Sequence, residues 1–173
     1  MPAKSSDNFE AMQSIISSSD ARTRNEAETR HKIIDFIVHD FLSWPKNRVA
    51  VEEYINPGYA DYILKKENGD DLLFIEAKKE GAYFEIPFAY SPQEKSSYIS
   101  IKKLVSDENI GKAVKQVRNY CFDTGCEYAA ITNGHEWIFF KTFERGKRWD
   151  ELQAFVIRRL EFFVDEYTKA INS

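Results

Sequence analysis

The sequence has few of the residues that build disulfide-stabilised or zinc-binding proteins. It contains two cysteines, Cys121 and Cys126, and three scattered histidines among 173 residues. A disulfide framework needs more cysteines, and a zinc site needs Cys or His ligands at a characteristic spacing that is missing here. We therefore expect free thiols in a cytoplasmic protein, and we expect His31, His39 and His135 to be ordinary surface or boundary residues.

The sequence also lacks a long apolar run and a nucleotide-binding loop. No hydrophobic stretch approaches the roughly 18 residues that cross a membrane, and residues 1–20 are polar and serine-rich, so we expect neither a membrane span nor a signal peptide. Gly111-Lys112 is followed by Ala113, where a Walker loop requires Ser or Thr. Any ATP-driven activity must therefore come from elsewhere.

The composition suits one domain of ordinary size. Hydrophobic residues make up 43% of the chain, which is enough to bury a core and excludes general disorder. We expect a polar N-terminal segment over residues 1–20 that forms a loose helix, followed by a single domain over residues 21–173.

Hydrophobic periodicity predicts the order of the elements. Apolar residues from Ile33 to Leu42 recur at helical spacing, and Trp44-Pro45 ends that helix. A second amphipathic helix is expected to return the chain so that the next strand enters the sheet in parallel. Residues 83–90 have no clean period and are expected to be a partly ordered excursion, which packs against the domain or covers the site. The remaining predicted elements are strands over 48–55, 59–66, 71–79, 128–132 and 136–142, and helices over 108–122 and 149–171.

Asn68-Gly69 predicts a tight hairpin between the second and third strands. A two-residue turn there pairs Glu67 with Asp70, and counting outward places Asp61 opposite Glu76. Directly opposed residues have Cβ atoms roughly 5 Å apart. A four-residue turn gives the same register, so the hairpin is expected to bring these two carboxylates together.

Lys78 completes this arrangement because side chains alternate along a strand, which places it on the same face as Glu76 and diagonal to Asp61. Opposed carboxylates repel each other and ask for a cation between them. Oxygen ligands favour a hard ion, and magnesium takes one or two carboxylates with water and phosphate. The alternative is a solvent-exposed cross-strand ion pair.

Ala60-Asp61 and Glu76-Ala77-Lys78 resemble the signature of the PD-(D/E)xK nuclease superfamily, with Ala in place of Pro before Asp61. The wider sequence resembles the amino-terminal nuclease domain of type I restriction enzyme R subunits and related phage-defence proteins over about residues 25–142. The segments that carry this resemblance are NEAETR (25–30), VEEYINPGYADYIL (51–64), LLFIEAKKEG (72–81), QVRNY (116–120) and AAITNGHEWIFF (129–140).

The resemblance implies an α/β fold with a restriction-endonuclease-like core (α-β-β-β-α-β), in which helices flank a mixed central sheet, and we expect a long C-terminal helix in addition. It also implies a metal-dependent endonuclease that hydrolyses DNA phosphodiesters in a restriction or anti-phage system. Mg²⁺, with Mn²⁺ as a substitute, is expected to bind Asp61, Glu76 and the Ala77 carbonyl. Lys78 is expected to serve the attacking water, and Lys79 to contact substrate.

Nucleases of this kind often place a helix-borne glutamate near the metal, and two candidates compete for that role. At 100° per residue, Glu26 lies about 70° and Glu28 about 130° from the centre of the apolar stripe, so Glu26 is favoured. Arg30, one turn further on, is expected to pair with Glu26 or to reach a phosphate. Both glutamates also suit the start of a helix for electrostatic reasons alone.

Gln116 and Tyr120 stand four residues apart in the second helix, on the flank of its apolar stripe. We expect both side chains to lie beside the buried face. The resemblance implies that this pair holds DNA or the catalytic groups.

The net charge of −4 is unusual for a protein that binds DNA, because affinity comes largely from neutralising phosphates. We therefore expect weak binding by this chain alone, with affinity supplied by a larger protein, a further domain or oligomerisation. Two alternatives to this function stay open: an inactive nuclease-fold module that acts in nucleic-acid binding or assembly, and a nuclease that acts on RNA or on special DNA structures.

Overall fold

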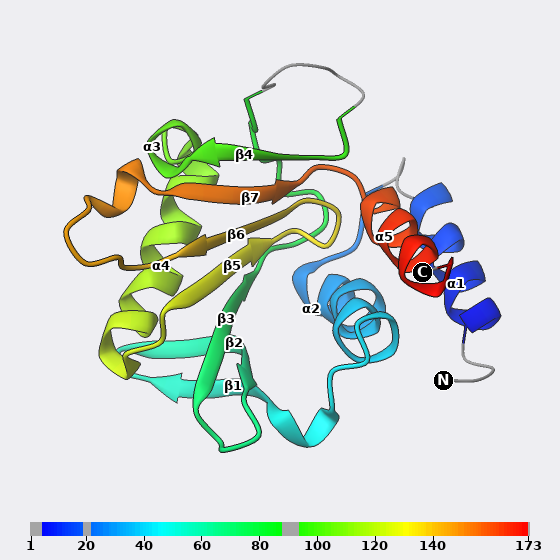
Figure 1. Ribbon diagram of the computed structural model, residues 1–173, viewed down its shortest axis with the longest axis horizontal. Helices are drawn as coiled ribbons and strands as arrows, with labels where there is room; N and C mark the ends of the chain where they lie inside the picture. The colour runs from blue at the N-terminus through cyan, green and yellow to red at the C-terminus, as the bar shows by residue number, and fades with distance from the viewer. Residues whose placement is uncertain (1–4, 19–21, 88–93, 173) are drawn as a thin grey trace.

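The protein is a mixed sheet enclosed by helices on both faces (Figure 1). The computed structural model describes residues 5–18, 22–87 and 94–172. Seven strands stand in the order β1-β2-β3-β5-β6-β7-β4. Only β3 and β5 pair in parallel among neighbouring described strands. The strands are β1 (Val49–Ile55), β2 (Gly58–Lys65), β3 (Asp71–Ala77), β4 (Ser96–Ser100), β5 (Tyr128–Thr132), β6 (Trp137–Lys141) and β7 (Gln153–Ile157).

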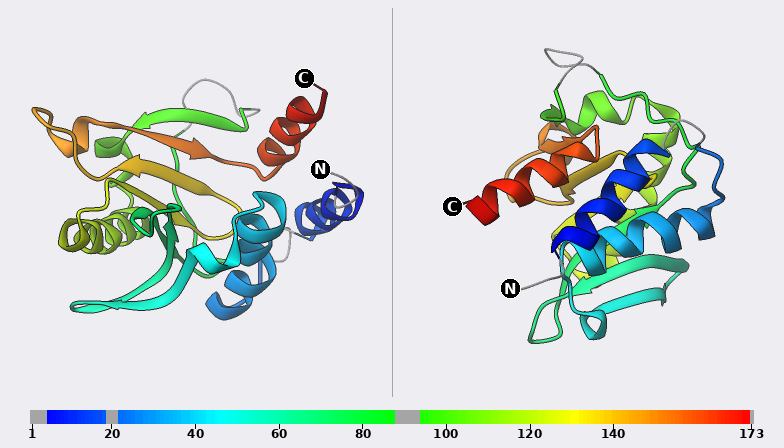
Figure 2. Two further views of the ribbon diagram at one scale, coloured as in Figure 1. Left: turned by 60° about the horizontal axis from the view of Figure 1, so that its bottom comes forward. Right: turned by 90° about the vertical axis from the view of Figure 1, so that its right-hand side faces the viewer.

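One face of the sheet is covered by α1 (Ser5–Ser17), α2 (Glu26–Thr29) and α5 (Glu161–Asn172), which gather on one side in both views of Figure 2. The helix begun by α2 continues through the π-helical segments η1 (Arg30–Ile34) and η2 (Phe36–Phe41). The opposite face is covered by α4 (Glu108–Thr124). Shorter pieces complete the chain: η3 (Lys46–Arg48), α3 (Ile101–Leu104) and η4 (Trp149–Glu151).

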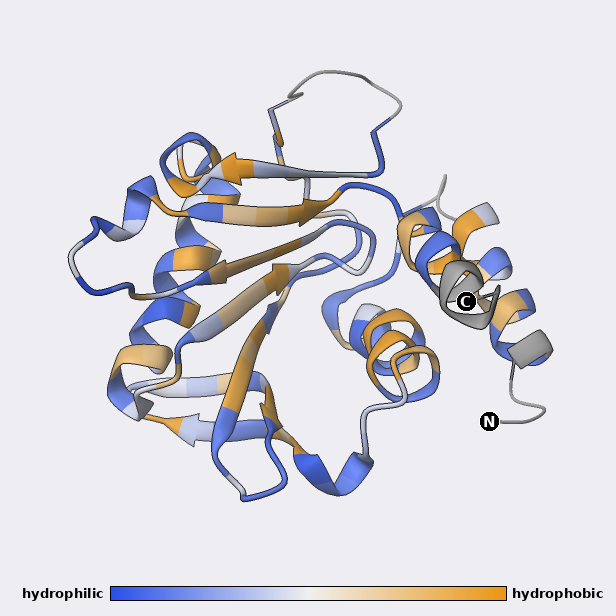
Figure 3. Ribbon diagram, viewed as in Figure 1, coloured by the Kyte–Doolittle hydropathy of each residue, from blue (hydrophilic) through white to orange (hydrophobic). Residues whose placement is uncertain are grey.

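The sheet has an apolar core on each face, and its central strands β3, β5 and β6 carry much of the orange hydrophobic colour in Figure 3. On the α4 face, Val114 and Val117 pack with Phe74. On the other face, Ile33 of the long helix and Met12 of α1 pack in one cluster with strand residues. Met12 is fully buried, so the serine-rich start of the chain contributes a helix to this core.

The predicted α-β-β-β-α-β core is confirmed as α2, β1, β2, β3, α4 and β5. The predicted parallel entry of residues 128–132 is confirmed by the β3–β5 pairing, with Ile75 opposite Ala130. The helix α4 begins at the N-cap Asp107, whose side chain accepts from the Ile110 N–H, and ends at Gly125 with φ 74°. The helix therefore has a side-chain N-cap at its start and a left-handed glycine at its end.

The predicted long helix over residues 149–171 is wrong in its first half. Residues 149–151 form η4, residues 153–157 form β7, and α5 begins only at Glu161. The apolar residues of this region fit a helical period, but β7 is inserted between β6 and β4 and pairs with both. Long-range strand pairing therefore overrides the local pattern.

Two smaller details differ from the expectations, and a third lies partly outside the described residues. Leu42 is 47% exposed, because it caps the helix where the chain turns away from the core. Strand β4 and helix α3 were not predicted, and β4 exists through its pairing with the distant β7. Part of the expected excursion over residues 83–90 lies outside the described residues, and residues 82–87 have no regular secondary structure.

In the described part of the chain, no helix is sufficiently long and apolar to span a membrane. Both cysteines are free and buried, in agreement with the expectation of free thiols.

Candidate active site

The hairpin of β2 and β3 has the predicted register where it matters for the site. Tyr62 lies opposite Ile75 and Ile63 opposite Phe74, and a bulge near the turn absorbs one extra residue. The turn is wider than predicted, because Lys66 donates its N–H to the Asp70 carbonyl, at 2.8 Å. The bulge restores the register, so the error at the turn does not reach the other end of the hairpin.

Asp61, Glu76 and Lys78 converge at the carboxyl end of β3. The Ala77 N–H donates to Asp61 Oδ2 at 2.8 Å, which fixes the Asp61 carboxylate beside β3. Lys78 forms an ion pair with Glu76 Oε1. The structure therefore brings together the three side chains that the strand pairing predicts.

Glu76 is a buried carboxylate that the protein satisfies only in part. Its side chain is 3% exposed, and Oε2 has no hydrogen-bond partner among the described residues. Burial and the charge of Asp61 raise the pKa of Glu76 to about 7, although the Lys78 ammonium opposes the shift. Such a group binds either a proton or a cation at neutral pH.

This raised pKa makes the stability of the metal-free protein pH-dependent. The folded state holds the Glu76 proton more tightly than the unfolded chain, so this contribution is complete below the ordinary pKa of 4.5 and is lost as pH rises through about 7. At pH 8 we expect the free energy of unfolding of Glu76→Gln, measured in urea, to exceed that of wild type by up to about 3 kcal/mol. The two proteins should converge near pH 4.5.

Urea titrations in EDTA at several pH values test this expectation. Glu67→Gln, at the exposed tip of the same hairpin, is the matched control and should follow the wild-type pH dependence. Parallel curves for wild type and Glu76→Gln would contradict a raised Glu76 pKa.

Arg30 is a second cation at the site. Its Nη1 lies 3.4 Å from Asp61 Oδ1 and 2.9 Å from Glu52 Oε1, and its guanidinium lies 5.2 Å from the centre of the Tyr62 ring. Burial raises the pKa of Asp61, while the Ala77 hydrogen bond and the charges of Arg30 and Lys78 act against the shift. Arg30 therefore partly balances the negative charge of Asp61.

Glu26 and Glu28 have different surroundings. The charge of Glu26 contributes to raising the pKa of both Asp61 and Glu76, so this carboxylate lies within electrostatic range of the site. Glu28 belongs to a capping box, in which its side chain accepts from the Asn25 N–H. These observations favour Glu26 over Glu28 as the helix-borne acid of the site.

The donor set of the site suits a hard divalent cation. Asp61 and Glu76 offer carboxylate oxygens, and Ala77 adds a backbone carbonyl. Because Glu76 Oε2 has no hydrogen-bond donor among the described residues, it is available to a cation. Among the described residues, no three His, Cys, Asp or Glu side chains form a group able to hold a metal. Two carboxylates with a carbonyl and water match the habits of Mg²⁺.

Gln116 and Tyr120 are neighbours in α4 but have different surroundings. Gln116 is exposed on α4, whereas Tyr120 is only 6% exposed and packs in the core. Its hydroxyl lies over Gly58, where an added Cβ would be 2.5 Å from the oxygen. The expectation that both side chains lie beside the buried face is therefore wrong for Tyr120, because Gly58 leaves room for its ring. Lys79 is exposed, immediately after Lys78.

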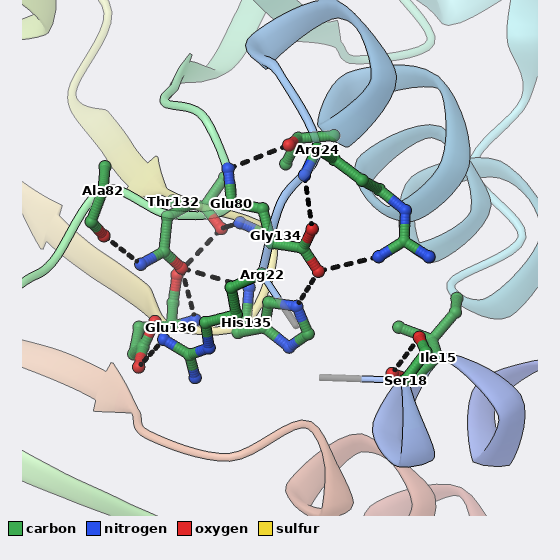
Figure 4. Close-up of polar contacts among 12 residues, drawn as sticks. Ile15, Ser18, Arg22, Arg24, Glu80, Ala82, Thr132, Gly134, His135 and Glu136 are labelled. Atoms are coloured by element: carbon green, nitrogen blue, oxygen red, sulfur yellow. Dashed lines mark hydrogen bonds and ion pairs between the residues drawn. The ribbon is translucent and has the colours of Figure 1, made fainter. Parts of the chain in front are cut away.

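A buried ionic network is centred on Glu80, two residues after Lys78 in the chain (Figure 4). Glu80 is fully buried, and its Oε1 forms an ion pair with Arg24 Nη1 (2.7 Å) and a hydrogen bond with His135 Nε2 (2.7 Å). Its carboxylate also accepts from the Arg24 N–H, and its own N–H donates to Thr29 Oγ1. The network ties the segment after Lys78 to the start of the long helix.

The sequence reasoning missed this network. His135 was expected at the surface or its boundary, but it is only 4% exposed. It was misjudged because its partner, Glu80, lies 55 residues away and only the fold brings them together. The one sequence signal is that Glu76, Lys78 and Glu80 recur at every second position, which marks Glu80 as a further charged residue near the end of the strand.

Two comparisons with known proteins found similarities to this chain. The sequence matches, over residues 2–148, the protein family described as type I restriction enzyme R protein N terminus. Among solved structures, the type IIG restriction endonuclease BpuSI is similar, with 18% sequence identity and a TM-score of 0.48. The similarity covers 77% of this chain and 13% of that one, so the chain spans a small part of the length of that enzyme. No curated protein matches the sequence.

Proposed function

The chain belongs to the family of the type I restriction enzyme R protein N terminus, and from this premise we propose that it is a metal-dependent DNA endonuclease module. The observation that carries the proposal is the buried Glu76 carboxylate, which has one oxygen without a partner and lies beside Asp61 and Lys78. A fold keeps such a cluster at a cost in stability, and strongly perturbed carboxylates concentrate at functional sites.

In this proposal Asp61, Glu76 and the Ala77 carbonyl hold Mg²⁺, or Mn²⁺ in its place. When bound, the ion polarises the phosphodiester and lowers the pKa of an attacking water. The hydrogen bond from the Ala77 N–H orients Asp61, and burial keeps Glu76 in one position. Lys78, which is 28% exposed, reaches from the protein toward solvent and orients or deprotonates the water, or stabilises the charge of the transition state.

Incubation of the purified chain with plasmid and linear DNA tests this function. We expect nicking or linearisation with Mg²⁺ or Mn²⁺ and none with EDTA. Absence of cleavage with every metal and every DNA form, by a protein that is folded, would overturn the proposal. A parallel RNA substrate distinguishes the two classes of nucleic acid.

Glu26 is proposed to support the metal site, and Glu28 only the helix end. We expect Glu26→Gln to reduce cleavage about 10- to 100-fold, the range for residues that support metal ligands. Glu28→Gln should cleave like wild type and lose only a fraction of the capping stabilisation, on the order of 1 kcal/mol. The two variants differ from wild type by the same change in charge, so equal and undiminished rates would remove both from the mechanism.

The module is proposed to act within a larger protein, with a further domain or in an oligomer of a restriction or anti-phage system. Its net charge of −4 gives it little overall attraction for DNA, so a partner is expected to supply most of the affinity. Arg30, Lys79 and Gln116 remain proposed contacts to substrate, whereas the buried Tyr120 is proposed only to support the fold. Of these, Arg30 lies closest to the catalytic cluster, through its pairing with Asp61.

A further inference from the structure

The carboxyl ends of strands β3, β5 and β7 lie at the same end of the sheet, which is called the catalytic edge below. β5 is parallel to β3, and β7 is antiparallel to β6, which is itself antiparallel to β5. Lys78 follows the end of β3, and Arg158 and Arg159 follow the end of β7 (Figure 1). The topology therefore places two arginines at the edge that carries the proposed catalytic residues.

A small cavity of about 150 Å³ opens at this edge. Its lining includes Arg22, His135, Arg158 and Arg159. The connection from β7 to α5 is hydrophilic over this part, as its blue colour in Figure 3 shows. Since a water molecule takes about 30 Å³, the cavity accommodates a phosphate group.

Packed loops join this cavity to the catalytic end of β3. The Lys78 N–H donates to the Thr132 carbonyl, and Glu80 binds Arg24 and His135. His135 lines the cavity, and its neighbour Glu136 forms an ion pair with Arg22 (Figure 4). The cavity and the catalytic cluster are thus connected through hydrogen-bonded loops.

Two of the arginines at the cavity, Arg22 and Arg159, are partly exposed, and the acidic residue Glu161 also lines the cavity. Arg22 is 37% exposed at its side chain and its partner Glu136 is 15% exposed. Arg159 is 50% exposed and its partner Glu161 is 30% exposed. A guanidinium has five N–H donors, and in the described part of the chain Arg22 donates to Glu136 through Nη1 and Arg159 to Glu161 through Nη2. The carboxylates orient both groups and leave other donors for a ligand.

On the basis of the function proposed above, we propose that Arg22 and Arg159 form a phosphate-binding subsite for the DNA strand that extends from the cleavage site. β3 and β7 are three strand spacings apart, or about 14 Å. A duplex carries one phosphate per strand for about every 3.4 Å of its axis, so a separation of this order spans a few phosphates of a bound strand. Arginine forks bind phosphate oxygens in pairs, which suits this role.

The test measures binding of a labelled 30-base-pair duplex in EDTA, where no cleavage occurs, between about 50 mM and about 200 mM salt. The variant is Arg22→Ala/Arg159→Ala, and the matched control is Lys112→Ala/Lys115→Ala. The control removes two exposed cations from α4, on the opposite face of the sheet, and Lys112 is ion-paired to Glu108 as Arg159 is to Glu161.

We expect the arginine variant to bind at least about tenfold more weakly and to lower the slope of log affinity against log salt by about two, near 0.9 for each lost phosphate contact. The control should stay within about twofold of wild type. Equal weakening of both variants, wild-type affinity in the arginine variant, or no wild-type binding at the lowest salt would each overturn the subsite. Thermal unfolding of each variant verifies that it is folded.

The readout separates this subsite from the catalytic proposal. If wild type binds DNA and the arginine variant does not, the subsite stands even when no metal supports cleavage. If wild type cleaves and the arginine variant binds and cleaves equally well, the catalytic proposal stands and the subsite is overturned.

Discussion

Replacing Lys78 by alanine is expected to slow metal-dependent DNA cleavage about 1,000-fold, within the range of about 10²–10⁴ for the loss of one acid–base or charge-stabilising group. Lys78 is the only one of the three converging side chains that combines a positive charge with partial exposure. It can therefore reach both the buried Glu76 and a bound phosphodiester. The measurement is the single-turnover rate on plasmid DNA with saturating Mg²⁺ or Mn²⁺.

Lys66→Ala is the matched control for this experiment. Lys66 is an exposed lysine at the turn of the same hairpin, at the end remote from the site, and its loss should leave cleavage within about twofold of wild type. Undiminished activity in Lys78→Ala would show that the cleavage comes from another site or from a contaminating nuclease. Binding of DNA in EDTA should change little in Lys78→Ala, because one phosphate contact at most is lost.

Among the variants proposed here, Glu80→Ala is expected to lose the most stability, with a free energy of unfolding lowered by about 3–5 kcal/mol. The side chain is fully buried, and its removal leaves Arg24 and His135 without their shared anion. For a chain of this size such a loss lowers the midpoint of thermal unfolding by roughly 10 °C. The network also ties the segment after Lys78 to the helix that carries Glu26, so cleavage should fall as well.

The pH dependence of this stabilisation provides an independent check. Burial alone would raise the pKa of Glu80, but hydrogen bonds from His135 and the Arg24 N–H, with the charge of Arg24, lower it. A lowered folded-state pKa gives stability that is present above the ordinary value of 4.5 and is lost as pH falls through the folded-state value. The difference between wild type and Glu80→Ala should therefore shrink in acid.

Glu85→Ala is the control for Glu80→Ala, since Glu85 is an exposed glutamate five residues along the same connection. Its unfolding midpoint should match that of wild type within about 1 °C. If Glu80→Ala unfolds at the same temperature as this control, the buried network does not stabilise the fold.

The hairpin shows how much of the site the sequence contained. Asn68-Gly69 and the strand residues around it predicted the turn region and the alternation of side chains, so Asp61, Glu76 and Lys78 were correctly expected to converge. The details of the turn were predicted wrongly, but a bulge absorbed the difference. Local propensity was sufficient here because the two strands are adjacent in the sequence.

Elements that depend on distant partners were not predictable in this way. The segment 153–157 has a pattern that suits a helix, and it is a strand because β6 and β4 offer hydrogen bonds on both sides. Tyr120 is buried because Gly58, 62 residues earlier in the chain, leaves space for its hydroxyl. His135 is buried because Glu80 offers it a partner across 55 residues.

The sequence by itself determined the central α-β-β-β-α-β order and the three charged groups of the hairpin, because helical and strand periods and a tight turn act over short separations. Only the tertiary structure decided what surrounds those groups. It buries Glu76, which raises the pKa of this carboxyl, and it brings the charges of Glu26 and Arg30 near the site. It also forms the network of Glu80 and places Arg22 and Arg159 at one cavity. Burial and charge depend on which distant segments pack together, and that is set by the competition of all segments for the same sheet.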